Sequence, residues 1–110
     1  MNRLKARIAA ALIFAGAFFL FGSASAKADD AAATFKSKCV ACHGADGSGN
    51  TSIGKSMHLR DLGSADVQKQ SDADLTAMIT NGKGAMPSYK GKLTDDQIHG
   101  LVTYIRTLKK

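Results

Sequence analysis

The chain has few cysteines and prolines, and it lacks the paired Cys and His ligands that a small zinc-stabilised domain needs. Its 110 residues include two cysteines and one proline. A structural zinc site usually takes four Cys or His ligands in two spaced pairs. The histidines outside the cysteine pair, His58 and His99, lie too far apart to form a second pair. The sequence therefore does not favour a zinc-stabilised fold.

Convincing β-strand patterns and internal repeats are also missing. A thioredoxin-like redox pair lies in a βαβ context, so this chain does not favour that fold. Apolar residues recur instead at helical spacing, most clearly near the C-terminus. That stripe consists of Ile98, Leu101, Val102, Ile105 and Leu108. We therefore expect an all-α domain with three to five helices.

The longest apolar run is too short to span a membrane. It covers residues 8–22, fifteen in all, whereas a spanning helix needs roughly 17–25 residues. Basic residues precede the run and Ala24-Ser25-Ala26 follows it, which is typical of a secretory signal peptide. We expect residues 1–26 to be a leader cleaved after Ala26, and residues 27–110 to be the exported domain. Cleavage after Ala28 and an uncleaved membrane anchor are the alternatives.

The basic charge of the chain belongs largely to this leader. Cleavage would remove three of the fifteen basic residues and none of the nine acidic ones, so the formal net charge falls from +6 to +3. Nucleic-acid binding is therefore not expected from the charge.

The two cysteines and a histidine form one short motif, Cys39-Val40-Ala41-Cys42-His43. Cys-x-x-Cys-His is the attachment signature of c-type haem. The two thiols can each form a thioether with a vinyl group of the porphyrin, and the adjacent imidazole can bind the iron as its proximal ligand. A plain disulfide would leave His43 unexplained. The motif predicts one covalently bound haem c.

Helix signals surround this motif. A helix is expected over residues 31–38, after Asp29 and Asp30, and a short helical turn over residues 66–70. Ser71 is a typical N-cap for a helix that ends at Asn81-Gly82. Thr94 and Gln97 have the spacing of a capping box for the last helix. The stretch from Ile53 to Leu62 has irregular apolar spacing and is expected to be a loop.

Met86 lies in the loop before the last helix and precedes the only proline, Pro87. Proline disfavours helical angles at the residue before it, so this thioether is presented from extended backbone. Met78 lies on an apolar helix face and fits a core position. His58 and His99 are expected on the surface, and ligation by either would make the site bis-histidine.

Together these segments resemble the small class I c-type cytochromes of bacteria, of the cytochrome c6 and c5 kind, over the whole exported domain. The resemblance implies a fold wrapped around one haem, with His43 as the proximal and Met86 as the distal iron ligand. Met57 is the next alternative for the distal ligand. It also implies that Phe35 and Tyr104 lie where the first and last helices cross, with Ala31 where relatives often have glycine.

One feature departs from that family. Relatives commonly have a proline after the haem motif whose carbonyl accepts the proximal histidine's Nδ1 proton, and this chain has no proline there. We expect a backbone carbonyl within residues 52–56 to accept that hydrogen bond instead.

The resemblance implies a monomeric periplasmic electron carrier rather than an enzyme. Redox partners are expected to dock at the exposed haem edge, with Lys83, Lys90 and Lys92 steering an acidic surface. Arg60 and Lys55 are candidate partners for the haem propionates. The alternative function is a haem sensor or peroxidase-like enzyme, which would need Met86 to be absent from the iron or easily displaced.

Overall fold

The computed structural model describes residue 16 and residues 24–110. Nearly all of the predicted leader lies outside the described residues, and its cleavage stays a prediction. The described residues form six helices: α1 (Ala24–Lys38), α2 (Val40–His43), α3 (Ser52–Ser56), α4 (Ala65–Gln68), α5 (Asp72–Asn81) and α6 (Asp95–Thr107). Three of them are long, and the extended backbone described between residues 24 and 110 makes two isolated bridges only. The predicted all-α class is confirmed.

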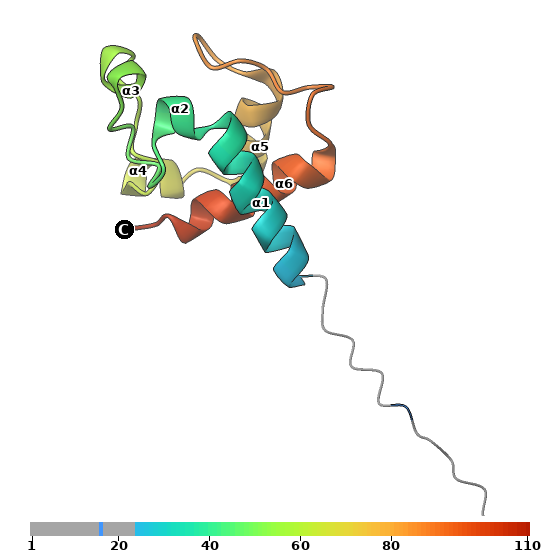
Figure 1. The fold of residues 1–110 in the computed structure, drawn as a ribbon. Helices are drawn as coiled ribbons and strands as arrows, with labels where there is room; N and C mark the ends of the chain where they lie inside the picture. The colour runs from blue at the N-terminus through green and yellow to red at the C-terminus, as the bar shows by residue number, and fades with distance from the viewer. Residues whose placement is uncertain (1–15, 17–23) are drawn as a thin grey trace, which may run out of the picture.

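The first and last long helices cross and form the centre of the core (Figure 1). Phe35 of α1 is 2 % exposed and Leu101 of α6 is 1 % exposed. The rings of Phe35 and Tyr104 are 4.8 Å apart, so the predicted contact at the crossing is confirmed. Burial of each such large apolar side chain contributes about 1.5–3 kcal/mol. A Cβ added to Gly100 of α6 would lie 3.4 Å from Ala31 Cβ, so the two helices are already in close contact.

Helix α1 begins earlier than the charge pattern predicts. The acidic pair Asp29–Asp30 was expected at its start, but the helix extends back to Ala24. Residues 24–28, which precede the pair, are rich in alanine, the best helix former, and contain neither glycine nor proline. The helix therefore starts before the acidic pair and continues through it.

The starts of α5 and α6 were predicted correctly, because their caps are local. The Ser71 hydroxyl accepts a hydrogen bond from the Asp74 amide at 3.0 Å. Thr94 Oγ1 accepts from the Gln97 amide at 3.1 Å, and Gln97 Oε1 accepts from the Thr94 amide at 2.9 Å. Each cap stabilises its helix by about 1 kcal/mol.

Helix α6 also holds the segment that leads into α5. Arg106 donates to the carbonyls of Gln68 at 2.8 Å and Gln70 at 2.6 Å, and it forms an ion pair with Asp72. The Gln68 side chain donates back to the Ile105 carbonyl of α6 at 3.0 Å. These bonds span more than thirty residues of sequence, and no sequence signal predicted them.

Helix α3 overlaps the start of the stretch expected to be an irregular loop, so that prediction was wrong there. Thr51 caps α3 by accepting from the Gly54 amide at 2.8 Å, and its hydroxyl donates to the Cys42 carbonyl at 2.7 Å. A Cβ on Gly54 would lie 2.1 Å from the Gly49 carbonyl oxygen. Glycine at position 54 thus lets α3 pack directly behind the Cys42 turn.

Among residues 24–110, no helix combines the length and the apolar character that crossing a bilayer requires.

Candidate haem-binding site

A cavity of about 580 Å³ lies between the motif, helices α5 and α6, and the loop that joins them. Its volume falls within the roughly 300–1,000 Å³ that is typical of ligand and cofactor pockets. In Figure 1, α2 and α3 lie to one side of the helix crossing and the α5–α6 loop lies to the other. Most of the wall is apolar, and its buried members are Phe35, Val67, Leu75, Ile79, Leu101 and Ile105.

The motif forms one wall of the cavity. Helix α1 stops at Lys38, and the amides of Cys42 and His43 both donate to the Cys39 carbonyl, at 3.2 and 2.9 Å. This turn brings the two thiols and the imidazole onto one short segment, as the attachment signature predicts. Both thiols are free. Cys39 and His43 line the cavity, whereas the half-buried Cys42 is not among its lining residues.

Burial sets the protonation states of the motif. It raises the pKa of the Cys39 thiol to about 11, with a smaller contribution from the charge of Cys42. It lowers the pKa of His43. At neutral pH the imidazole is therefore uncharged, which is the form that binds a metal ion.

The Nδ1 atom of His43 is buried and has no hydrogen-bond partner within the described part of the chain. The expectation that a carbonyl of residues 52–56 accepts its proton is therefore wrong. Those residues are helical, and the carbonyls of Ile53 and Gly54 accept instead from the amides of Met57 and Leu59. Metal-bound histidines usually donate their second ring N–H to an acceptor. Among the described residues, the Nδ1 atom of His43 has no such acceptor.

Met86 lies in the α5–α6 loop and lines the same cavity as His43. Its amide donates to the Lys83 carbonyl at 3.0 Å and its carbonyl accepts from the Lys83 amide at 3.1 Å. Gly82 has a φ of +72°, and a Cβ there would lie 2.6 Å from the Met86 carbonyl oxygen. The glycine that ends α5 thus allows the tight loop that positions Met86.

Two other methionines also line the cavity. Met78 projects from α5 and is half-buried, so the position predicted for the core belongs to the cavity wall. Met57 follows α3 and is 47 % exposed. Met86 differs from Met78 because it lies outside a helix, and from Met57 because it is less exposed and its amide and carbonyl are both hydrogen-bonded to Lys83.

The charges around the cavity are of one sign. Arg60 and Lys83 line it, and none of its lining residues carries a carboxylate. Lys55, the other candidate propionate partner, is not a lining residue. His58 lines the exposed rim with a positive φ of 53°. A cationic rim around an apolar interior fits a flat apolar group with two acidic substituents, such as haem.

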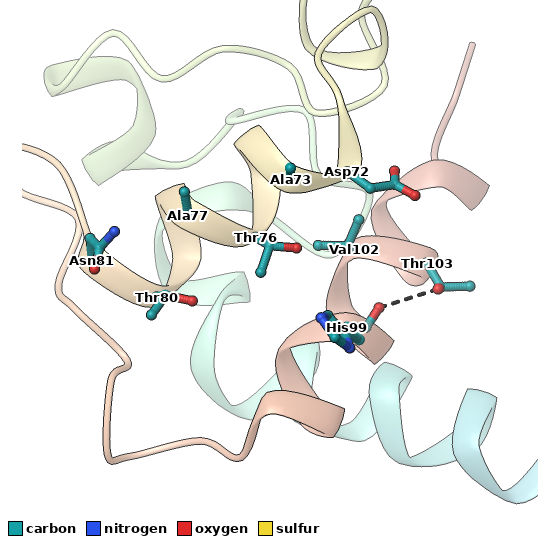
Figure 2. A pocket seen from close by; sticks show the side chains of 9 residues that line it. All are labelled: Asp72, Ala73, Thr76, Ala77, Thr80, Asn81, His99, Val102 and Thr103. Carbon is teal, nitrogen blue, oxygen red and sulfur yellow. Dashed lines mark hydrogen bonds between the residues drawn. The ribbon is translucent and has the colours of Figure 1, made fainter.

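A second groove runs between α5 and α6 and carries none of the motif residues (Figure 2). Small and hydroxyl side chains line most of it, and the Thr103 hydroxyl donates to the His99 carbonyl at 3.2 Å. His99 is exposed, as predicted, and Asp72 is paired with Arg106. The haem chemistry therefore belongs to the cavity beside His43.

Comparison with known proteins shows the family of the chain. The family model described as cytochrome C oxidase, cbb3-type, subunit III matches residues 26–105. Cytochrome c6 of Leptolyngbya boryana is 42 % identical over 79 residues, which cover 69 % of this chain and 89 % of the relative. The chain is a cytochrome c6-like, monohaem c-type cytochrome.

Other members of this family agree over similar lengths. Cytochrome c6 of Synechocystis sp. is 36 % identical over 96 residues, covering 86 % of this chain and 78 % of the relative. The solved KustC0563 c-type cytochrome superposes with a TM-score of 0.67 at 33 % identity, covering 74 % of this chain and 99 % of its own. This cytochrome is an electron carrier and not an enzyme, as predicted. Membership of the family implies covalent haem c, and Cys39, Cys42 and His43 fit its attachment motif.

Proposed function

We propose that this cytochrome is a periplasmic one-electron carrier whose haem iron is bound by His43 and Met86. The observation that carries the proposal is that these two side chains, distant in sequence, line one cavity. Cys39 and Cys42 would hold the haem through thioether bonds, and the bound haem supplies a one-electron redox centre.

The residues of the cavity determine what such a centre can do. His43 and Met86 would together hold the iron and would leave no open position for a substrate. The apolar wall solvates the additional charge of ferric iron poorly, and a thioether is a weak donor. Both effects favour the ferrous state and raise the reduction potential.

Arg60 and Lys83 are the proposed partners of the haem propionates. Both line the cavity, and no carboxylate among the lining residues competes for them. Lys55 is set aside because it lies outside the lining.

Partner docking is proposed at the loop that carries Met86. Lys83, Lys90 and Lys92 are exposed there, and a cluster of positive charge accelerates encounter with an acidic surface. Replacing the three lysines with glutamine should slow electron exchange with an acidic partner, and should remove most of its dependence on ionic strength.

The periplasmic location rests on the predicted leader. Sequencing the N-terminus of the protein from a periplasmic extract should find Lys27 as the first residue. An intact Met1 in the membrane fraction would support the membrane-anchored alternative.

The optical spectrum of the ferric protein tests the ligation. Methionine bound to ferric haem gives a weak far-red band, which Met86→Ala should abolish while lowering the potential. Met57→Leu is the matched control, because Met57 also lines the cavity and its replacement should leave the band unchanged. A wild-type protein that lacks the band and rapidly binds cyanide would support a sensor or peroxidase-like function instead.

A further inference from the structure

Where α1 ends, the carbonyls of its last turn lose the partners that a continuing helix would give them, and the Lys38 carbonyl is one of these. In a continuous helix the Lys38 carbonyl would accept from the Cys42 amide, four residues on. That amide donates instead to the Cys39 carbonyl at 3.2 Å. The haem-attachment turn therefore frees an acceptor at the last residue of α1.

The hydroxyl of Tyr89 is the hydrogen-bond partner of this carbonyl. It donates to the Lys38 carbonyl at 3.0 Å, across 51 residues of sequence. The backbone of Tyr89 is held as well, because its amide donates to the Ile79 carbonyl at 3.2 Å and its carbonyl accepts from the Leu93 amide at 3.0 Å. Burial raises the pKa of Tyr89, so the hydroxyl keeps its proton at neutral pH.

This bond differs from the others that hold the Met86 loop. The Ser88 hydroxyl donates to the Thr80 carbonyl at 2.7 Å, and the Lys90 amide donates to the same carbonyl at 3.0 Å. Those bonds fasten the loop to α5, its own neighbour in sequence. Among residues 24–110, the Tyr89–Lys38 bond is the one hydrogen bond that joins this loop to the segment carrying Cys39, Cys42 and His43.

We propose that Tyr89 is a positioning residue that fastens the Met86 loop to the end of α1 and so keeps Met86 on the iron. The inference rests on the proposed ligation by Met86. The Tyr89 ring lines the cavity beside Met86 and packs against the core. The hydroxyl sets the distance between the loop and the helix end that precedes the attachment turn. Loss of this bond should let the loop open more often without unfolding the helices.

The test compares Tyr89→Phe with Tyr104→Phe in the haem-containing protein. Each variant loses one hydroxyl and keeps its aromatic ring. The Tyr104 ring packs against Phe35 in a tilted arrangement, and no hydrogen bond from its hydroxyl is found within the described residues. The measurement is the rate at which imidazole replaces Met86 in the ferric protein, followed through the far-red band. Circular dichroism gives the midpoint of global unfolding in parallel.

Tyr89→Phe should raise the replacement rate about fivefold, the factor that corresponds to one neutral hydrogen bond of about 1 kcal/mol. Tyr104→Phe should leave the rate within twofold of the wild type. Equal rates for the wild type and Tyr89→Phe, with the far-red band present in both, would overturn the proposal. So would an equal acceleration in both variants, because it would reflect a general loss of stability.

Hydrogen exchange separates this inference from the proposed ligation. The Met86 amide is bonded to the Lys83 carbonyl, so its exchange rate reports loop opening whatever binds the iron. A wild-type protein without the far-red band would overturn Met86 ligation. The loop-fastening role would then be decided by amide exchange alone: faster exchange in Tyr89→Phe supports it, and unchanged exchange overturns it.

Discussion

The two sides of the haem cavity are built by different means. On the motif side, Cys39, Cys42 and His43 lie on one turn of the chain, backed by α3 through Thr51. On the methionine side, Met86 lies in a loop that is fastened both to α5, its neighbour in sequence, and through Tyr89 to the distant α1. The attachment motif is thus local in the sequence, whereas the position of the proposed distal ligand depends on tertiary structure.

The largest effect is expected from removing the local side altogether. The double variant Cys39→Ser, Cys42→Ser has no thiol to form a thioether, so it should carry no covalent haem. A domain of this size has a limited core, and without haem it would lack a large apolar group to pack around. The exported variant should therefore also accumulate poorly. Haem staining after denaturing electrophoresis is the measurement, and a stained band in the double variant would contradict the proposed attachment.

A smaller but still large effect should follow from Gly54→Ala, which disturbs the packing behind the motif. The new Cβ would meet the carbonyl oxygens of Gly49 and Cys42 at 2.1 and 2.8 Å. Overpacking of this kind costs about 1–3 kcal/mol, so the free energy of unfolding should fall by about 2 kcal/mol in denaturant titration.

The matched control is Gly100→Ala. Its Cβ would make an ordinary 3.4 Å contact with Ala31, and alanine gains about 1 kcal/mol in a helix interior. Gly100→Ala should therefore be neutral or stabilising. Equal destabilisation by the two variants would mean that the close packing of α3 behind the motif has no special cost.

These two sides also explain which features could be predicted from the sequence. The attachment motif and the caps at Ser71 and Thr94 use partners within a few residues, so their spacing is visible in the chain. Helix α3 was missed because Ile53 is 48 % exposed and the segment has no apolar stripe at helical period. Its Thr51 cap, three residues before Gly54, was the available signal.

Long-range polar contacts could not be predicted in the same way. Arg106 lies in a helix with a clear apolar stripe, and nothing in the sequence marks Gln68 and Gln70 as its acceptors. The same is true of the Tyr89 hydroxyl, whose acceptor exists only because α1 breaks at Lys38. Met86 was recognisable because Pro87 marks its extended loop, but its approach to His43 is a property of the fold.

Arg106→Gln tests the long-range polar contacts, and its effect on stability should be of intermediate size. The substitution removes donors to two carbonyls and the ion pair with Asp72. Hydrogen bonds from charged groups contribute about 1.5–3 kcal/mol, and partial exposure reduces this value, so unfolding should become easier by about 1–2 kcal/mol. Lys69→Ala is the control, because its ion pair with Asp66 is exposed and contributes about 0–1 kcal/mol.

The smallest effect is expected at the C-terminus, where Lys110 pairs with Asp61 and its amide donates to the Gly63 carbonyl at 3.1 Å. The hydrogen bond from Lys110 holds the pKa of Asp61 below its usual value. The folded state therefore favours the carboxylate, and the stabilisation is present above the unfolded pKa and lost as the pH falls through the folded one.

Lys110→Ala should accordingly lower the melting temperature slightly at neutral pH and leave it unchanged in strong acid. The substitution keeps the backbone amide that bonds Gly63, so the loss is confined to the lysine side chain. A difference in melting temperature that persists after Asp61 is protonated would show that the lysine stabilises the C-terminus through packing of its methylene chain, since that contact does not titrate.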